Sequence, residues 1–296
     1  MSRRAKIALG IGIWFGGTVI LLVIFGSHGK NTTYSPQDEF KLHKWVDLGI
    51  FSINQAVLYL FLAGILTCAT MIYVARRMQQ RPNRVQTLVE VIFQGLQNNI
   101  VGTNMDRKMA VRWFPFIATL ALFIFFSNLV GFIPLPTDTA AQTINIFGLH
   151  IPPFSLYAAT ANLSIPLALA LVVFASYTYE GVRKKGPIGY LRGLVPGGVH
   201  GVMAVFIFFL ELLSNVMRLL SLSIRLFANI LAGHLIILFM AGALAVLLGV
   251  AALGWFTLPF GIILFIFEVG LVAALQAFIF ATLTAIYLGG AVADHH

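Results

Sequence analysis

Five ionisable side chains stand between His200 and Tyr287, which lie at the two ends of the last long apolar tract of the chain: Glu211, Arg218, Arg225, His234 and Glu268. A charge at the centre of a bilayer costs about 2.5–3.5 kcal/mol on insertion scales, so such side chains usually face a partner, a cavity or an ion path. A guanidinium group cannot shed its charge, whereas carboxyl and imidazole groups can take up and release protons. These residue types in this setting therefore predict a path for an ion or a proton.

The polar residues of this tract recur at the spacing of one helix face. Steps of three or four residues join Glu211, Ser214, Arg218, Ser221, Arg225 and Asn229. On an α-helix these residues line a single stripe. His234 comes nine residues after Arg225, so it lies about half a revolution away from the stripe. We expect a second helix, which carries Glu268 and Gln276, to be the partner of this imidazole.

The stripe contains more positive than negative charge. Glu211 can pair with Arg218, seven residues further on, and an ion-pair network that only packs helices is the alternative interpretation. Glu211 cannot neutralise both Arg218 and Arg225, however, so one guanidinium has no partner within the chain. Because an unpaired buried charge is costly, another chain must supply a carboxylate or water must reach this cation.

The composition of the chain indicates a lipid environment. Of its 296 residues, 59% are hydrophobic and 10% are charged, whereas soluble domains carry about 25% charged residues. The net charge of +9 could suggest nucleic acid. We exclude that partner, because the basic residues lie in short clusters beside apolar runs, as the positive-inside rule describes. The single cysteine, Cys68, allows neither a disulfide framework nor a cysteine-based metal site within the chain.

Apolar runs long enough to cross a hydrocarbon core of about 30 Å occupy residues 7–26, 50–75, 110–133 and 157–179. The final tract could form two, three or four further crossings, and Gly249, Gly254 and Pro259 mark one turn in it. If residues 199–248 form one helix, it is about 75 Å long, which favours a strongly tilted hairpin.

Segment 85–101 has a different pattern. Its apolar residues recur at helical spacing, and its Gln, Glu and Asn side chains lie mostly on other faces. This pattern predicts an amphipathic helix that lies on the cytoplasmic surface of the membrane.

The first apolar run could be a retained helix or a cleaved signal peptide. It is longer than the roughly 7–15 residues of a typical signal core, and it has no A-x-A cleavage motif. We favour a retained helix. The predicted organisation is therefore an extra N-terminal transmembrane helix with an external loop over residues 1–49, and a membrane domain over residues 50–296.

The basic residues also predict the orientation of the chain. Fourteen of the nineteen Lys and Arg residues lie in four segments, "SRRAK", "ARRMQQRPNR", "MDRKMAVR" and "VRKKGPIGYLR". Placing the N-terminus in the cytoplasm puts every one of these clusters inside. With an even number of crossings in the final tract, the C-terminus also lies in the cytoplasm.

Three motifs resemble subunit a of the F-type ATP synthase, also called subunit 6, of the bacterial type. "SLSIRLFANILAGHLI" resembles the central arginine motif of that family, "LQAFIFATLTAIYL" its C-terminal helix, and "FFSNLVGFIPLPTDT" the segment after the amphipathic helix. The similarity extends from about Phe51 to the C-terminus. It implies an all-α polytopic membrane protein with five family-type helices, to which this chain adds the N-terminal helix. It also implies the amphipathic surface helix and a long tilted C-terminal hairpin.

The resemblance implies roles for individual residues. Arg225 matches the arginine that faces the rotating c-ring, with Ser221, Asn229 and Gln276 as polar neighbours. The inner half-channel uses Glu211, and the outer one uses His234, Glu268 and Asn128. When the direction of the helix is used to assign the half-channels, Ser214 joins the inner one and Asp138 the outer one. One departure concerns Glu268, which lies eight residues before Gln276, where the family pattern has seven. The extra residue swings the side chain by about 100° unless a π-bulge absorbs it.

The function that follows is a proton-translocating stator subunit of the membrane sector. The implied partners are the c-ring, the peripheral-stalk subunit b and membrane lipid, in the inner or plasma membrane of a cell. We expect no catalytic residues, cofactor or metal, and protons rather than sodium as the coupling ion.

A secondary transporter is less favoured because inverted repeats are not apparent. A membrane enzyme is less favoured because no nucleophile–base pair or HExxH motif is present, and a passive scaffold does not need two arginines on one face.

Overall fold

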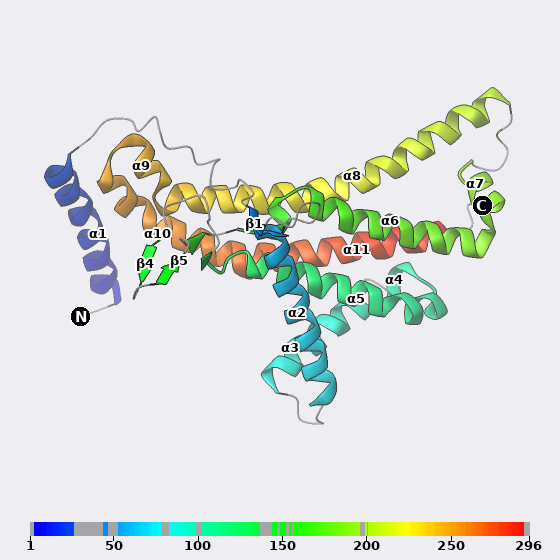
Figure 1. The fold of residues 1–296 in the computed structure, drawn as a ribbon, viewed down its shortest axis with the longest axis horizontal. Helices are drawn as coiled ribbons and strands as arrows, with labels where there is room; N and C mark the ends of the chain where they lie inside the picture. Colours follow the sequence, from blue (N-terminus) through cyan, green and yellow to red (C-terminus); the bar gives the residue numbers. More distant parts are fainter. Residues whose placement is uncertain are drawn as a thin grey trace. The chain divides into compact units, whose positions relative to one another are not determined.

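The computed structural model describes residues 3–26, 44–46, 53–77, 83–98, 102–136, 144–146, 149–151, 154–155, 157–195, 199 and 201–292. Its helices are α1 Arg3–Phe25, α2 Gln55–Arg76, α3 Arg84–Leu96, α4 Gly102–Asn104, α5 Arg107–Val130, η3 Ala159–Ala161, α6 Ser164–Lys185, α7 Pro187–Arg192, α8 Val202–Leu238, η4 Phe239–Ala243, α9 Leu244–Leu248, α10 Ala251–Phe267, η5 Glu268–Val272 and α11 Ala273–Val292 (Figure 1). The short strands are β1 Lys44–Val46, β2 Ile53–Asn54, β3 Leu135–Pro136, β4 Ile144–Ile146, β5 Leu149–Ile151 and β6 Phe154–Ser155. They form three antiparallel pairs, β1–β2, β3–β6 and β4–β5.

Six helical segments of the described chain are long and apolar enough to cross a membrane. Four of them, α1, α2, α5 and α6, correspond to the four apolar runs of the sequence. The final tract supplies two more, α8 and the continuous segment from α10 through η5 to α11. The prediction of an all-α polytopic membrane protein is therefore confirmed.

The turn in the final tract lies at one of the three predicted residues. Gly249 has φ 66°, a left-handed conformation that favours glycine, and α10 begins two residues later. The prediction was wrong for Gly254 and Pro259, which lie inside α10. Proline is tolerated within membrane helices because neighbouring groups can satisfy the freed backbone carbonyl.

Helix α8 is unbroken for 37 residues, about 55 Å at 1.5 Å per residue. It is followed by the π-helical segment η4, in which Gly242 has φ 152°. Residues 199–248 are therefore not one regular helix, and the expected length of about 75 Å is too large.

The amphipathic segment forms α3 over Arg84–Leu96. Val89 and Leu96 are buried against the protein, whereas Val85 and Val91 are exposed. Gln86 donates a 2.6 Å hydrogen bond to Glu90, one turn further along the helix. The helix is too short to span a bilayer, which agrees with the predicted surface helix.

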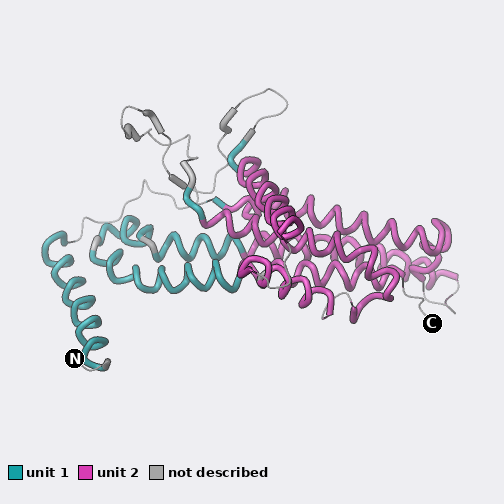
Figure 2. The backbone as a smooth tube through the Cα atoms, turned by 90° about the horizontal axis from the view of Figure 1, so that it is seen from below, with its two compact units in different colours: residues 1–55, 133–157, 230–272 teal, residues 56–132, 158–229, 273–296 magenta. Residues whose placement is uncertain are grey.

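Two compact units make up the chain (Figure 2). Unit 1 contains residues 1–55, 133–157 and 230–272. Within it α1 packs on α10, where the Trp14 ring stacks on Phe256 with centroids 4.9 Å apart. The indole N–H of Trp14 also donates to the backbone oxygen of Trp255 at 3.3 Å. The extra N-terminal helix is therefore a packed part of unit 1. The domain boundary between residues 49 and 50 stays a prediction.

Unit 2 contains residues 56–132, 158–229 and 273–296, and α11 packs there against both α5 and α6. Ala277, Ala281 and Ala285 recur every four residues on the buried face of α11. Small side chains at this spacing let membrane helices approach closely. At one end of the same unit, Arg112 of α5 pairs with the buried Glu180 of α6 at 3.2 Å.

We expect Ala281→Leu to destabilise the protein, because Ala281 is fully buried and extra methylene groups in a packed interface cost about 1–3 kcal/mol. Thermal unfolding of the detergent-solubilised protein measures the effect. The matched control is Ala274→Leu, which places the same change on the exposed side of α11. Equal melting temperatures for the two variants would contradict the close packing of α11.

Candidate functional site

The polar stripe of the sequence lies on one face of α8. The helix is regular from Val202 to Leu238, so steps of three and four residues keep the six stripe residues within about a quarter turn. Ser221 and Arg225 are exposed, and the other four are half-buried: Glu211, Ser214, Arg218 and Asn229. The predicted stripe is therefore present, with its central arginine on the surface of unit 2.

The two arginines of the stripe have different surroundings. Arg218 lies 3.5 Å from Glu211 and 5.8 Å above the centre of the Tyr287 ring. The sequence suggested this ion pair as the alternative to a functional stripe, and the structure forms it. Arg225 makes no ion pair with a described residue. One guanidinium thus remains uncompensated in the described part of the chain, as the charge count predicted.

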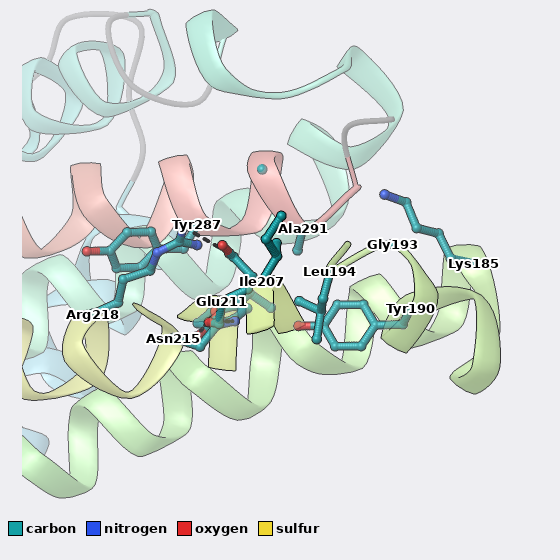
Figure 3. Close-up of a pocket in the computed structure, with 12 residues that line it drawn as sticks. Lys185, Tyr190, Gly193, Leu194, Ile207, Glu211, Asn215, Arg218, Tyr287 and Ala291 are labelled. Carbon is teal, nitrogen blue, oxygen red and sulfur yellow. Dashed lines mark hydrogen bonds and ion pairs between the residues drawn. The ribbon is translucent and has the colours of Figure 1, made fainter. Parts of the chain in front are cut away.

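A cavity of about 420 Å³ opens beside the N-terminal half of α8 in unit 2. Glu211, Asn215 and Arg218 line it from α8, and Tyr287 lines it from α11 (Figure 3). Tyr177 lines it from α6. Charged, amide and phenol groups in one cavity can hold water and pass protons between them. Glu211 therefore lies in a cavity whose lining is polar enough to hold water.

His234 lies on the other side of α8 and is 5% exposed. Its Nδ1 lies 3.1 Å from the backbone oxygen of Ile230. Because a carbonyl oxygen only accepts, Nδ1 carries the proton in this hydrogen bond. If the ring is neutral, Nε2 is the nitrogen that acts as an acceptor.

Glu268 begins the π-helical segment η5, and its side chain is buried. The carboxylate lies against Gly233, the residue before His234, so closely that a Cβ at position 233 would overlap it. Its Oε1 has no hydrogen-bond partner among the described residues. A buried ionised carboxylate without a partner is costly, so this group suits a site that binds and releases a proton.

The π-helical turn also explains the spacing of the second motif. A π-bulge adds one residue to a helix without rotating the segments on its two sides. Glu268 opens that turn and Gln276 lies in the regular helix α11 that follows it. This turn can absorb the extra residue between them, and the role of Glu268 stays a prediction.

Two further predicted residues lie in unit 2. Asn128 of α5 is fully buried, and its Oδ1 accepts a 2.9 Å hydrogen bond from the hydroxyl of Thr160. Gln276 is buried on α11. Asp138 lies outside the described residues.

The model of the family described as ATP synthase A chain matches residues 57–289. Among curated proteins, ATP synthase subunit a of Rubrobacter xylanophilus is 33% identical over 239 residues, which cover 80% of this chain and 83% of the relative. The subunit a of Anaplasma marginale is 35% identical over 268 residues, covering 88% of this chain and 100% of the relative. The subunit a of Maricaulis maris is 32% identical over 272 residues, which cover 88% of this chain and 98% of the relative. The chain belongs to the ATP synthase subunit a family.

As a subunit a, the protein is a multi-pass membrane component of the proton-translocating sector of ATP synthase, in a complex with other subunits of that enzyme. The match to the family model begins within α2, so the extra helix α1 precedes the matched range. All candidate residues from Asn128 to Gln276 lie inside the matched range.

Sequence reasoning missed four residues of this subunit a that contact the predicted residues directly or, for Tyr177, through Asn215. Thr160 donates to Asn128, and Tyr287 lies under Arg218. Tyr177 donates a 3.3 Å hydrogen bond to Asn215, which in turn donates to the backbone oxygen of Glu211. The pairs Thr160–Asn128, Tyr177–Asn215 and Tyr287–Arg218 are distant in sequence, and no local spacing signals such pairs.

Proposed function

We propose that this subunit a is the proton-translocating stator of the membrane sector. It forms two offset half-channels that protonate and deprotonate the carboxylates of a rotating c-ring, and thereby drives rotation. The observation that carries the proposal is the exposed guanidinium of Arg225, which is uncompensated within the described chain. The cost of such a charge in a membrane is offset when another chain brings a carboxylate to it.

The chemistry follows from the energy of a carboxylate in lipid. A rotor carboxylate can face acyl chains only when it is neutral, because an ionised group is too costly there. Beside Arg225 the opposite charge favours the ionised form. Protons must therefore be delivered on one side of Arg225 and removed on the other, and Ser221, Asn229 and Gln276 are its polar neighbours in this exchange.

The direction of α8 assigns the two half-channels. With its N-terminal end toward the cytoplasm, Glu211 and Ser214 belong to the inner half-channel, and the 420 Å³ cavity supports that role. His234 and Glu268 belong to the outer half-channel, together with the buried Asn128 and with Asp138. Each proton that crosses gains about 2.3 kcal/mol per 100 mV of membrane potential, which biases the rotation.

Arg225 has a second role between the half-channels. A fixed cation repels a hydronium ion, and a guanidinium group cannot itself carry a proton. It therefore prevents a direct leak from one half-channel to the other. Lysine is a poorer choice, because burial favours its neutral form.

The remaining parts of the proposal concern location and partners. The chain lies in the inner or plasma membrane with both termini in the cytoplasm, and it contacts subunit b of the peripheral stalk as well as the c-ring. The long C-terminal hairpin is tilted in the membrane. The coupling ion is the proton, and the subunit itself performs no catalysis and holds no cofactor or metal.

A density map of the complete membrane complex tests the proposal. We expect a carboxylate of a ring subunit opposite Arg225, with subunit b elsewhere on the same chain. A map in which Arg225 pairs with an acid of its own chain, or faces acyl tails without a ring, would overturn it.

The π-helical turn provides a functional prediction. Deletion of Gly270, inside η5, is expected to convert the turn to α-helix and to keep Glu268 in register with α11, so that proton flux stays within about threefold of the parent. Insertion of one alanine after Gly270 is the matched control. It should rotate Glu268 by about 100° and lower the flux at least about tenfold. Passive proton flux through reconstituted membrane sectors measures both, and equal losses would contradict the assigned register.

A further inference from the structure

Arg218 is held away from the exposed part of the stripe by two contacts. Its guanidinium pairs with Glu211 at 3.5 Å and lies 5.8 Å from the centre of the Tyr287 ring. Glu211 precedes Arg218 by two helical turns, so the arginine side chain extends back along α8 toward the cavity (Figure 3). Its guanidinium therefore lies at the cavity, beside Glu211 and Tyr287.

The part of α8 that carries this ion pair is fixed by hydrogen bonds. Asn215 is buried and lies between Glu211 and Arg218 on the helix. Its side-chain amide donates to the backbone oxygen of Glu211 at 3.0 Å and accepts from the Tyr177 hydroxyl at 3.3 Å. The bond from Tyr177 joins α6 to α8, and the bond to Glu211 lies within α8. Glu211 and Arg218 both line the same cavity.

We propose that Arg218 is a positioning residue for Glu211 and that the two form a charge-compensated pair, which determines the ion selectivity of the cavity. A lone carboxylate in a partly enclosed cavity attracts and retains cations, and a lone guanidinium repels them. With both present at 3.5 Å, each charge largely cancels the other at a distance. The proposal deepens the proposed function, because it concerns the cavity assigned there to the inner half-channel.

The pair also explains why the stripe contains two arginines. Only Arg225 is left to act on a rotor carboxylate, because Arg218 is already paired within the chain. Lys185 lines the same cavity and has an interaction of its own. Its contribution stays constant when either member of the pair is changed.

The charge of the cavity can be measured with thiol reagents. Cys68 is exposed, so we start from a Cys68→Ser background and introduce Ala291→Cys on the cavity wall. The purified complex in detergent is treated with a cationic and an anionic methanethiosulfonate of similar size. The ratio of the two reaction rates reports the potential at position 291, and a purely structural role of Arg218 would not change it.

We expect Arg218→Gln to raise the ratio of cationic to anionic rate about tenfold, because Glu211 loses its counter-charge. Glu211→Gln should lower the ratio by a similar factor. The double variant Glu211→Gln with Arg218→Gln should return to within about twofold of the parent, as should the single variant Arg218→Lys. Unchanged ratios in both single variants, or a double variant that keeps the shift of one of them, would overturn the proposal.

The outcome is independent of the proposed function. If the ratios behave as expected but Arg225→Ala retains coupled transport, the proposed function fails and the compensated pair stands. If Arg225→Ala loses transport and the ratios do not move, only the role of Arg218 fails. The amount of assembled complex, measured for every variant, separates both results from misfolding.

Discussion

Arg225→Ala is expected to abolish coupled proton transport, lowering ATP-driven acidification of reconstituted vesicles at least about a hundredfold. The described chain offers Arg225 no acid of its own, so its charge is available to a rotor carboxylate. Without the guanidinium, that carboxylate has no site in the membrane at which its ionised form is favoured. The rotor then cannot release its proton beside the stator, and rotation is uncoupled from proton flow.

Two further variants show whether the effect belongs to this arginine. Arg192→Ala makes the same change at an exposed arginine of the short helix α7, and should keep normal acidification. Arg225→Lys should also lose coupling, because a lysine can release its proton where a guanidinium cannot. Normal ATP-driven pumping by Arg225→Ala, at a normal level of assembled complex, would rule out the assigned role.

Elements with a regular period were predictable from the sequence. The spans follow from uninterrupted apolar runs, and the stripe follows from steps of three and four residues on what proved to be one regular helix, α8. The shortage of negative charge on that stripe could also be predicted, because the acids and arginines can be counted in the sequence alone. Gly249 marked the turn correctly since its positive φ is a conformation that other residues rarely adopt.

Contacts between distant segments were not predictable. Nothing local indicates that Trp14 stacks on Phe256, or that Tyr287 lies under Arg218. The side chain of Arg218 could equally have faced a partner chain, because its position on the stripe gives its direction only within about a quarter turn. Pro259 was misjudged because proline interrupts helices in water more often than in the membrane interior.

Gly233→Ala is expected to lower proton flux about tenfold while leaving stability nearly unchanged. A methyl group at this position would overlap the carboxylate of Glu268. That carboxylate is the end of a flexible side chain, so it can move aside at little cost to folding. The movement takes the proton-binding group away from its place beside the backbone that carries His234, and proton transfer depends steeply on such distances.

The matched control is Gly16→Ala in α1, where an added methyl group meets nothing within 4 Å. Both variants should unfold at the parental temperature, but only Gly233→Ala should lose passive proton flux. A second substitution, Glu268→Asp, shortens the side chain by one methylene and should restore part of the flux when combined with Gly233→Ala, because the overlap is relieved while a carboxyl group is retained. Unimpaired flux in Gly233→Ala would mean that the position of Glu268 against α8 does not matter for transport. The Oε1 atom of Glu268 has no hydrogen-bond partner among the described residues, so the carboxylate should be free to move. A large loss of stability in Gly233→Ala would contradict that freedom.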